Sequence, residues 1–237
     1  MRGFAILMVL ALAACNVQQP VAVPPGPVGQ VVAPAPAPRP DGRMAARNFI
    51  SVIETVEPVA ERECRMRTRG VNCDYVIAVD SRPESPPNAF QTVGEDGRPI
   101  VGFTIALIAE ARNVDELAFI LGHEAAHHIE GHIDRGRQSA YQGAVLAGIL
   151  ATVGGVGPEQ IREAQNIGAS IGARRYSKTF ELEADALGTI IAARAGYDPV
   201  RGAQYFARTP DPGNAFLGTH PPNAQRIETV RRVAAGL

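Results

Sequence analysis

Residues 122–127 read Gly-His-Glu-Ala-Ala-His, and the rest of the chain is best interpreted outward from this stretch. On a helix, His123 and His127 lie one turn apart on the same face, so both imidazoles can reach one metal ion. Glu124 is turned by about 100° from His123, beside the two rings, where a general base is needed. The apolar residues 117–121 that precede the stretch indicate a site built inside the protein. The spacing predicts a metal site with His123 and His127 as ligands and Glu124 as a catalytic residue.

A catalytic zinc ion needs a third protein ligand, and the residues leave two candidates. His132 follows His127 by five residues, whereas the metzincin pattern needs six, so on a continuous helix its ring turns away from the metal. We therefore interpret His132, and also His128, as supporting or surface groups. The second candidate is the acidic segment Glu181–Asp185, on a later predicted helix.

Four blocks of sequence follow one another between Asp115 and Ile227: Asp115–His127, Tyr176–Asp185, Ala195–Pro199 and Thr219–Ile227. Together they resemble the HtpX-like and CAAX-prenyl-endopeptidase-like zinc metallopeptidase family, including its periplasmic and mitochondrial Oma-type branch. The resemblance implies a zinc endopeptidase that binds one Zn²⁺ and uses Glu181 as the third ligand. Zinc would lower the pKa of a bound water, and Glu124 would take its proton and deliver it to the leaving amine.

Three further residues are expected to support this site. Asp185 lies one turn after Glu181 and is placed to accept the second N–H of a ligating His. Arg226 could pair with Asp185 or with a substrate carbonyl. The resemblance places His220 near the cleft, where it could stabilise the developing oxyanion or close the open zinc position; it could also merely cap the last helix. Glu183 is expected to be solvated or paired elsewhere.

The first 43 residues predict a targeting signal followed by a linker to a membrane anchor. The apolar run Phe4–Ala14 is far shorter than the roughly 20 residues of a membrane-spanning helix, and it ends at Leu-Ala-Ala-Cys15, which resembles a bacterial lipobox. We expect residues 1–14 to be a signal peptide and Cys15 to be lipidated, with a plain secreted protein as the alternative. Asn16 favours the outer membrane, facing the periplasm. Residues 15–43 read as a Pro-rich linker, and residues 44–237 as the metallopeptidase domain.

Composition limits the partners. Lys and Arg number 23 against 24 Asp and Glu, so no net positive field attracts nucleic acid. The expected partners are unfolded or misfolded protein substrates, and the membrane through the N-terminal lipid; the oligomeric state stays open. Cys64 and Cys73 remain once Cys15 is lipidated, and in an oxidising compartment we predict that they form a disulfide.

Hydrophobic periodicity predicts an α+β fold, mainly helical, with a small antiparallel sheet before the helix of residues 122–127. The family resemblance implies that this domain is zincin-like. A first helix over 44–67 should be kinked or divided at Pro58. The uncharged segment Ser139–Gly157 contains five Gly, so we interpret it as a closely packed helix, or one near a membrane surface, and not as a membrane span. The strands are expected at 74–80, 88–93 and 98–103, and the later helices at 104–112, 115–136, 139–153, 158–174, 179–195, 199–207 and 222–235.

The function expected from these features is a zinc-dependent endopeptidase that cuts unfolded or misassembled envelope proteins. The strand over 88–93 could lend an edge to an extended substrate. The alternative is an adaptor for envelope-protein assembly and quality control, with a latent zinc site closed by His220. A purely structural lipoprotein is a third alternative. It would require His123, Glu124, His127 and Glu181 to occur in this pattern by chance.

Overall fold

The computed structural model describes residues 39–175, 177–213 and 220–237, which belong to one compact unit. The predicted signal peptide, the lipidation site Cys15 and the predicted linker up to residue 38 lie outside the described residues. They therefore stay predictions.

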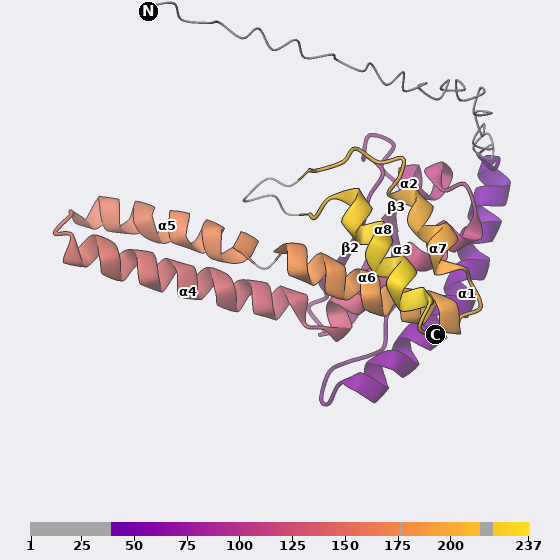
Figure 1. Ribbon diagram of the computed structural model, residues 1–237, viewed down its shortest axis with the longest axis horizontal. Helices are drawn as coiled ribbons and strands as arrows, with labels where there is room; N and C mark the ends of the chain where they lie inside the picture. Colours follow the sequence, from indigo (N-terminus) through magenta and orange to yellow (C-terminus); the bar gives the residue numbers. More distant parts are fainter. Residues whose placement is uncertain (1–38, 176, 214–219) are drawn as a thin grey trace, which may run out of the picture. The chain divides into compact units, whose positions relative to one another are not determined.

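The unit is mostly helical, with one small sheet formed early in the chain (Figure 1). This confirms the α+β class. The elements in chain order are α1 (Gly42–Arg67), β1 (Val76–Asp80), β2 (Ala89–Val93), β3 (Pro99–Thr104), α2 (Ile105–Glu110), α3 (Val114–Ile129), α4 (His132–Val153), α5 (Pro158–Arg175), α6 (Ser177–Arg194), α7 (Pro199–Gly202), the 3₁₀ turn η1 (Ala203–Tyr205) and α8 (Asn223–Ala234).

The sheet is mixed, so the expectation of an antiparallel sheet is only half correct. β2 and β3 form the antiparallel hairpin that the turn at residues 94–98 predicts, with Gly97 in a left-handed conformation. β1, however, pairs with β3 in parallel, which gives the order β1-β3-β2. The segment 81–88 between β1 and β2 is long enough to carry the chain past the place of β3, and no local pattern encodes that path.

The helix α1 continues through Pro58, so of the two outcomes expected there, a kink or a division, the division is wrong. Proline removes one backbone hydrogen bond. Val56 and Val59 on either side of it are buried, and α1 packs along α3, so tertiary packing keeps the helix in one piece. Two further links fix α1. Cys64 forms a disulfide with Cys73, and the buried carboxylate of Glu63 pairs with Arg194 of α6.

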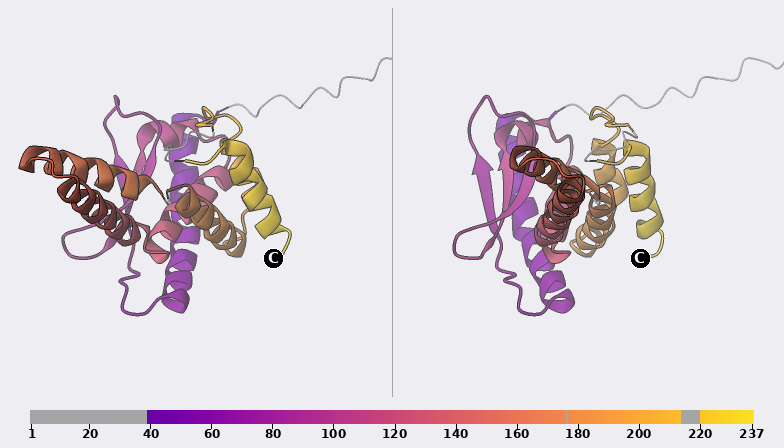
Figure 2. Two further views of the ribbon diagram at one scale, coloured as in Figure 1. Left: turned by 60° about the vertical axis from the view of Figure 1, so that its left-hand side comes forward. Right: turned by 90° about the vertical axis from the view of Figure 1, so that its left-hand side faces the viewer.

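α3 is the central helix and is almost wholly buried. The sheet and α1 contact it on one side, while α6 covers another side and in turn carries α8 (Figure 2). Asn113 caps its first turn by accepting a hydrogen bond from the Glu116 amide at 3.1 Å. The buried Glu116 carboxylate also receives two hydrogen bonds from Arg208, at 2.7 and 2.8 Å, which tie the segment after η1 to α3.

A single helix over 115–136 is not observed. α3 ends at Ile129 because Gly131 adopts a left-handed conformation with φ 66°, and α4 then starts at His132. No proline follows before Pro158, and α4 runs on through its glycines to Val153, so it includes the segment expected to start at Ser139. The helix expected over 199–207 is also shorter and consists of α7 and η1.

α3 and α6 cross at a pair of glycines, and this contact brings their side chains to one site. A Cβ atom added to Gly188 would lie 2.8 Å from the backbone nitrogen and 2.9 Å from the Cα atom of His123. A Cβ atom on Gly122 would lie 2.9 Å from the Gly188 carbonyl oxygen. Backbone atoms cannot give way as a flexible side chain can, so the crossing requires both glycines.

We expect Gly188→Ala to destabilise the protein by about 2–3 kcal/mol, since the added methyl group pushes the two helix backbones apart. Gly136→Ala is the matched control, because Gly136 lies in α4 and a Cβ atom there meets nothing within 4 Å. The control should be neutral or stabilising by roughly 0.5–1 kcal/mol. Urea unfolding measures both values. Equal stability of the two variants would contradict the close crossing.

Candidate metal centre

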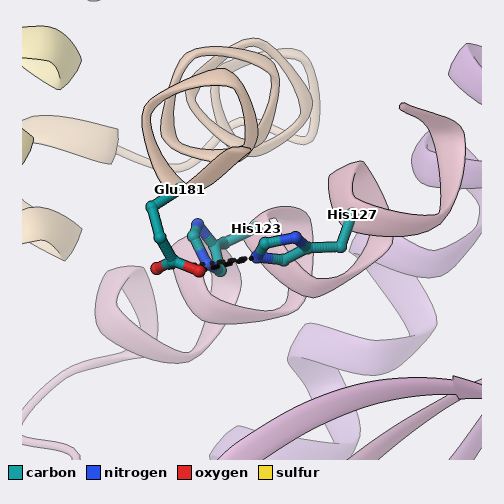
Figure 3. A group of neighbouring side chains, drawn as sticks. All are labelled: His123, His127 and Glu181. Carbon is teal, nitrogen blue, oxygen red and sulfur yellow. Dashed lines mark hydrogen bonds and ion pairs between the residues drawn. The ribbon is translucent and has the colours of Figure 1, made fainter. Parts of the chain in front are cut away.

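His123 and His127 on α3 and Glu181 on α6 point their donor atoms at one place (Figure 3). The two imidazole Nε2 atoms are 3.0 Å apart. The carboxylate oxygens of Glu181 lie 3.4 Å from Nε2 of His127 and 3.7 Å from Nε2 of His123. Donor atoms around a tetrahedral zinc ion, each bonded at 2.0–2.1 Å, are about 3.3 Å from one another. The three side chains therefore fit zinc in both chemistry and spacing.

The second ring nitrogen of His123 faces Asp185, one turn along α6 from Glu181. Nδ1 of His123 lies 3.0 Å from a carboxylate oxygen of Asp185, whose side chain is fully buried. Arg226 of α8 donates two hydrogen bonds to the same carboxylate, at 2.7 and 2.8 Å. Burial acts to raise the pKa of Asp185, but these Arg226 contacts keep it below its ordinary value. Asp185 is thus an ionised acceptor that can hold Nδ1–H of His123 and leave Nε2 free for a metal.

Arg226 is also placed by two further contacts. Its guanidinium lies 3.8 Å from the ring centroid of Phe206, and its Nη1 atom is 3.3 Å from a carboxylate oxygen of Glu181. Of the two partners considered for Arg226, the structure pairs it with Asp185, so its charge is directed at the acidic groups of the site.

The second ring nitrogen of His127 faces His132, and this contact was missed from the sequence. The Nδ1 atoms of the two rings are 2.8 Å apart, and Nε2 of His132 lies 2.9 Å from Glu183. Burial lowers the pKa of His132 to about 4, so its ring is neutral at pH 7. Since the Glu183 carboxylate accepts, Nε2 of His132 donates; Nδ1 of His132 then accepts from His127. With these tautomers Nε2 of His127 carries no hydrogen, and its lone pair faces the metal position.

The contacts from His127 through His132 to Glu183 form a chain of hydrogen bonds, which we call the relay. The neighbours of His132 hold it in place. Its ring stacks on Phe180 at 4.5 Å between centroids, and Arg135 donates a hydrogen bond of 2.6 Å to Glu183. His132 could reach His127 only because the helix breaks at Gly131. On the uninterrupted helix that we expected, the His132 ring points away.

We expect His132→Leu to lower metal affinity roughly 10- to 100-fold, because His127 loses the acceptor that fixes its tautomer. Leu still fills the space against Phe180. Glu183→Gln should cause a smaller loss, since an amide oxygen can still accept from His132. Competition with a chromogenic chelator measures affinity, and thermal unfolding of the metal-free chains shows whether packing has changed. Unaltered affinity in a folded His132→Leu protein would refute the relay.

Glu124 and the three donors line one cavity of about 440 Å³. The same cavity is bounded by residues 87–89, which lead into β2, and by Phe206, His220 and Arg226. Burial raises the pKa of Glu124 above its ordinary value, although His123, His127 and Arg226 oppose the shift. A carboxylate with a raised pKa is a stronger base, as proton transfer in catalysis requires.

His220 lies at the mouth of this cavity, with half of its side chain exposed. Its Nδ1 atom is 3.1 Å from a carboxylate oxygen of Glu181. Burial acts to raise the pKa of Glu181, but its contacts with His127, His220 and Arg226 hold it well below its ordinary value. The helix-cap interpretation of His220 is wrong, because the residue at the N-cap of α8 is Pro222.

The residues 47–234 match peptidase family M48. The chain belongs to this family. The resemblance drawn from the four sequence blocks is thereby confirmed at the level of the family, and one of the relatives that the chain matches is named a metalloendopeptidase. The fold of this M48 chain brings together the residue types that such chemistry needs, at the distances described above.

Three relatives carry similar sequence. A beta-barrel assembly-enhancing protease of Vibrio cholerae is 29% identical over 144 residues, which are 54% of this chain and 29% of that protein. The mitochondrial metalloendopeptidase OMA1 of Saccharomyces cerevisiae is 29% identical over 170 residues, 67% of this chain and 46% of that protein. OMA1 of Arabidopsis thaliana is 29% identical over 131 residues, 54% of this chain and 26% of that protein. The M48 chain thus spans less than half the length of each of these relatives.

Proposed function

We propose that this M48 metallopeptidase is a zinc-dependent endopeptidase that acts on unfolded or misassembled proteins of the cell envelope. The observation that carries the proposal is the convergence of His123, His127 and Glu181 in a cavity that Glu124 also lines. We assign the first three as metal ligands and Glu124 as the general base.

Zinc, when held by these ligands, supplies a Lewis acid that lowers the pKa of water and polarises the scissile carbonyl. The proton transfers and the positioning of the ligands are carried out by side chains of the protein. Glu124 accepts the proton of the attacking water and passes it to the amine that leaves. Asp185 and His132 hold the two imidazoles in one tautomer each, and Arg226 keeps Asp185 ionised.

The position of β2 supports an extended substrate. Among the described residues β2 pairs only with β3, so its other edge is available for a backbone, and residues 87–89 line the cavity. A peptide added along this edge would be held by backbone hydrogen bonds, which tolerate many sequences but require an unfolded chain.

The location is proposed from the sequence. The lipobox-like Leu-Ala-Ala-Cys15 and the following Asn16 support a lipoprotein anchored to the outer membrane, with its active site in the periplasm. The name of the Vibrio cholerae relative, a beta-barrel assembly-enhancing protease, supports envelope proteins as substrates.

Digestion of casein by the purified chain tests the enzymatic proposal. We expect hydrolysis that stops when a chelator removes the metal and returns when one equivalent of zinc is added. Hydrolysis that persists in metal-free protein, or that never occurs in protein with one bound zinc per chain, would overturn it.

One observation favours a second candidate, a latent site in an assembly or quality-control adaptor. His220 touches the proposed ligand Glu181 from the mouth of the cavity, where it could hinder access. If His220 keeps the site closed, His220→Ala should hydrolyse casein faster than the wild-type chain. If His220 instead stabilises the oxyanion in an open enzyme, the same variant should be slower, and initial rates distinguish the two.

A further inference from the structure

The hairpin of α4 and α5 carries an apolar surface that peptide hydrolysis does not use. The two helices extend side by side away from the other helices (Figure 1). They pack through small residues, since a Cβ atom on Gly143 would collide with the Gly168 backbone and one on Gly172 with the Ser139 backbone. With the backbones this close, the large apolar side chains of the hairpin are left outside its own packing.

Six of these side chains form one surface, which we call the α4 face. They follow a spacing of three and four residues along α4. Some of them flank the contact with α5, since Leu146 and Leu150 line a hollow together with Ile171 of α5. Between 40% and 82% of each residue is exposed. Large apolar side chains that are exposed and adjacent in this way form a continuous apolar patch, and such a patch on a soluble protein marks an interaction site. The α4 face consists of Tyr141, Val145, Leu146, Ile149, Leu150 and Val153.

Charge is separated between the two helices. No charged residue occurs from Gln138 to Gly157, so α4 is uncharged after its first turns. The hairpin's other charges lie on α5, at Glu159, Arg162, Glu163, Arg174 and Arg175. A helix facing water normally places charged groups on its outer side. The arrangement here is that of a helix at a lipid interface, where the apolar side enters the headgroup and acyl boundary and the charged side stays in water.

We propose that the α4 face binds the surface of a lipid bilayer, with α4 parallel to the membrane plane. The exposed Ile171 of α5, which lies beside Leu146 and Leu150, would reach the same boundary, while the charged residues of α5 stay on the aqueous side. Packed helices are about 8–10 Å apart, so the charges of α5 remain hydrated while α4 enters the acyl boundary. No helix in the described part of the chain is long and apolar enough to cross a membrane. The polar Gln142 and Thr152 on α4 suit an interface, where water remains within reach.

The N-terminal sequence is consistent with such a contact. The 23 residues 16–38 separate Cys15 from the described residues. An extended Pro-rich chain covers about 3.1 Å per residue, so a lipid on Cys15 could anchor to the same bilayer. The α4 face does not require that anchor, nor the proposed peptidase activity. Its binding can therefore be measured without either.

Vesicle flotation of the full-length chain with Cys15→Ser, which cannot be acylated, tests the proposal. The probe is a vesicle of phosphatidylethanolamine and phosphatidylglycerol. We expect the parent chain to float with the vesicles and the double variant Leu150→Glu/Val153→Glu to lose at least 10-fold of the bound fraction. Met66→Glu is the matched control, because Met66 is 66% exposed on α1, and it should float like the parent.

Three results would overturn the proposal. The parent chain could remain at the bottom of the gradient, the double variant could float as well as the parent, or Met66→Glu could lose binding to the same extent. A second copy of the chain is the other occupant that an exposed apolar face of this kind accepts. Sedimentation velocity without vesicles therefore accompanies the assay, and a dimer that the double variant abolishes would assign the α4 face to a second copy. Thermal unfolding confirms that each variant is folded.

Discussion

Glu124→Gln is expected to reduce peptide hydrolysis roughly 1,000-fold, because an amide cannot accept the proton of the attacking water. The metal content should stay at the wild-type level. Glu124 lines the cavity but is not one of the three converging donors, and Gln has nearly the same size as Glu. Initial rates of casein digestion, measured beside zinc content, separate the loss of a base from the loss of a ligand.

The matched control is Glu130→Gln, which makes the same chemical change at the C-cap residue that follows α3. Glu130 does not line the cavity, so the rate should match that of the wild-type chain. Undiminished hydrolysis by Glu124→Gln would remove Glu124 from its assigned role. Loss of metal in this variant would instead mean that Glu124 is a ligand.

Glu181→Gln should have the second large effect, a fall in zinc affinity of at least about 100-fold. Glu181 is the only donor of the three that comes from α6, and its charge is what balances a divalent cation between two neutral imidazoles. Contacts with His127, His220 and Arg226 keep the pKa of Glu181 low, so it is a carboxylate throughout the neutral range. An uncharged amide oxygen is a much weaker ligand for zinc.

Affinity is measured by competition with a chelator of known affinity, in parallel with Glu228→Gln. Glu228 is an exposed residue of α8, and its replacement should leave affinity unchanged. If Glu181→Gln binds zinc as tightly as the wild-type chain, the third ligand must be sought elsewhere, with His220 and His132 as the nearest imidazoles.

Much of the site could be anticipated from local sequence. The four-residue spacing of His123 and His127 depends only on helix geometry, and so does the shared face of Glu181 and Asp185 on α6. The meeting of these two faces could not be derived in the same way. It depends on the glycine crossing of α3 and α6 after a long excursion through α4 and α5, and only family resemblance pointed to Glu181.

Other parts were hidden because they depend on a single backbone conformation or on long-range packing. The left-handed turn at Gly131 redirects His132 to His127, and neither helical periodicity nor the spacing of the histidines indicates it. The insertion of β3 between β1 and β2 is likewise a property of the whole chain path. The pairing of Arg208 with Glu116 joins two segments that no sequence pattern connects.

The central claim is that α3 and α6 together enclose one divalent cation. Anomalous diffraction at the zinc absorption edge, from crystals of the zinc-loaded chain, tests it most directly. We predict one peak per chain, within about 2.0–2.2 Å of Nε2 of His123, Nε2 of His127 and a carboxylate oxygen of Glu181. A peak at any other place, or a Glu181 carboxylate turned away from a zinc ion held by the two imidazoles, would contradict the account.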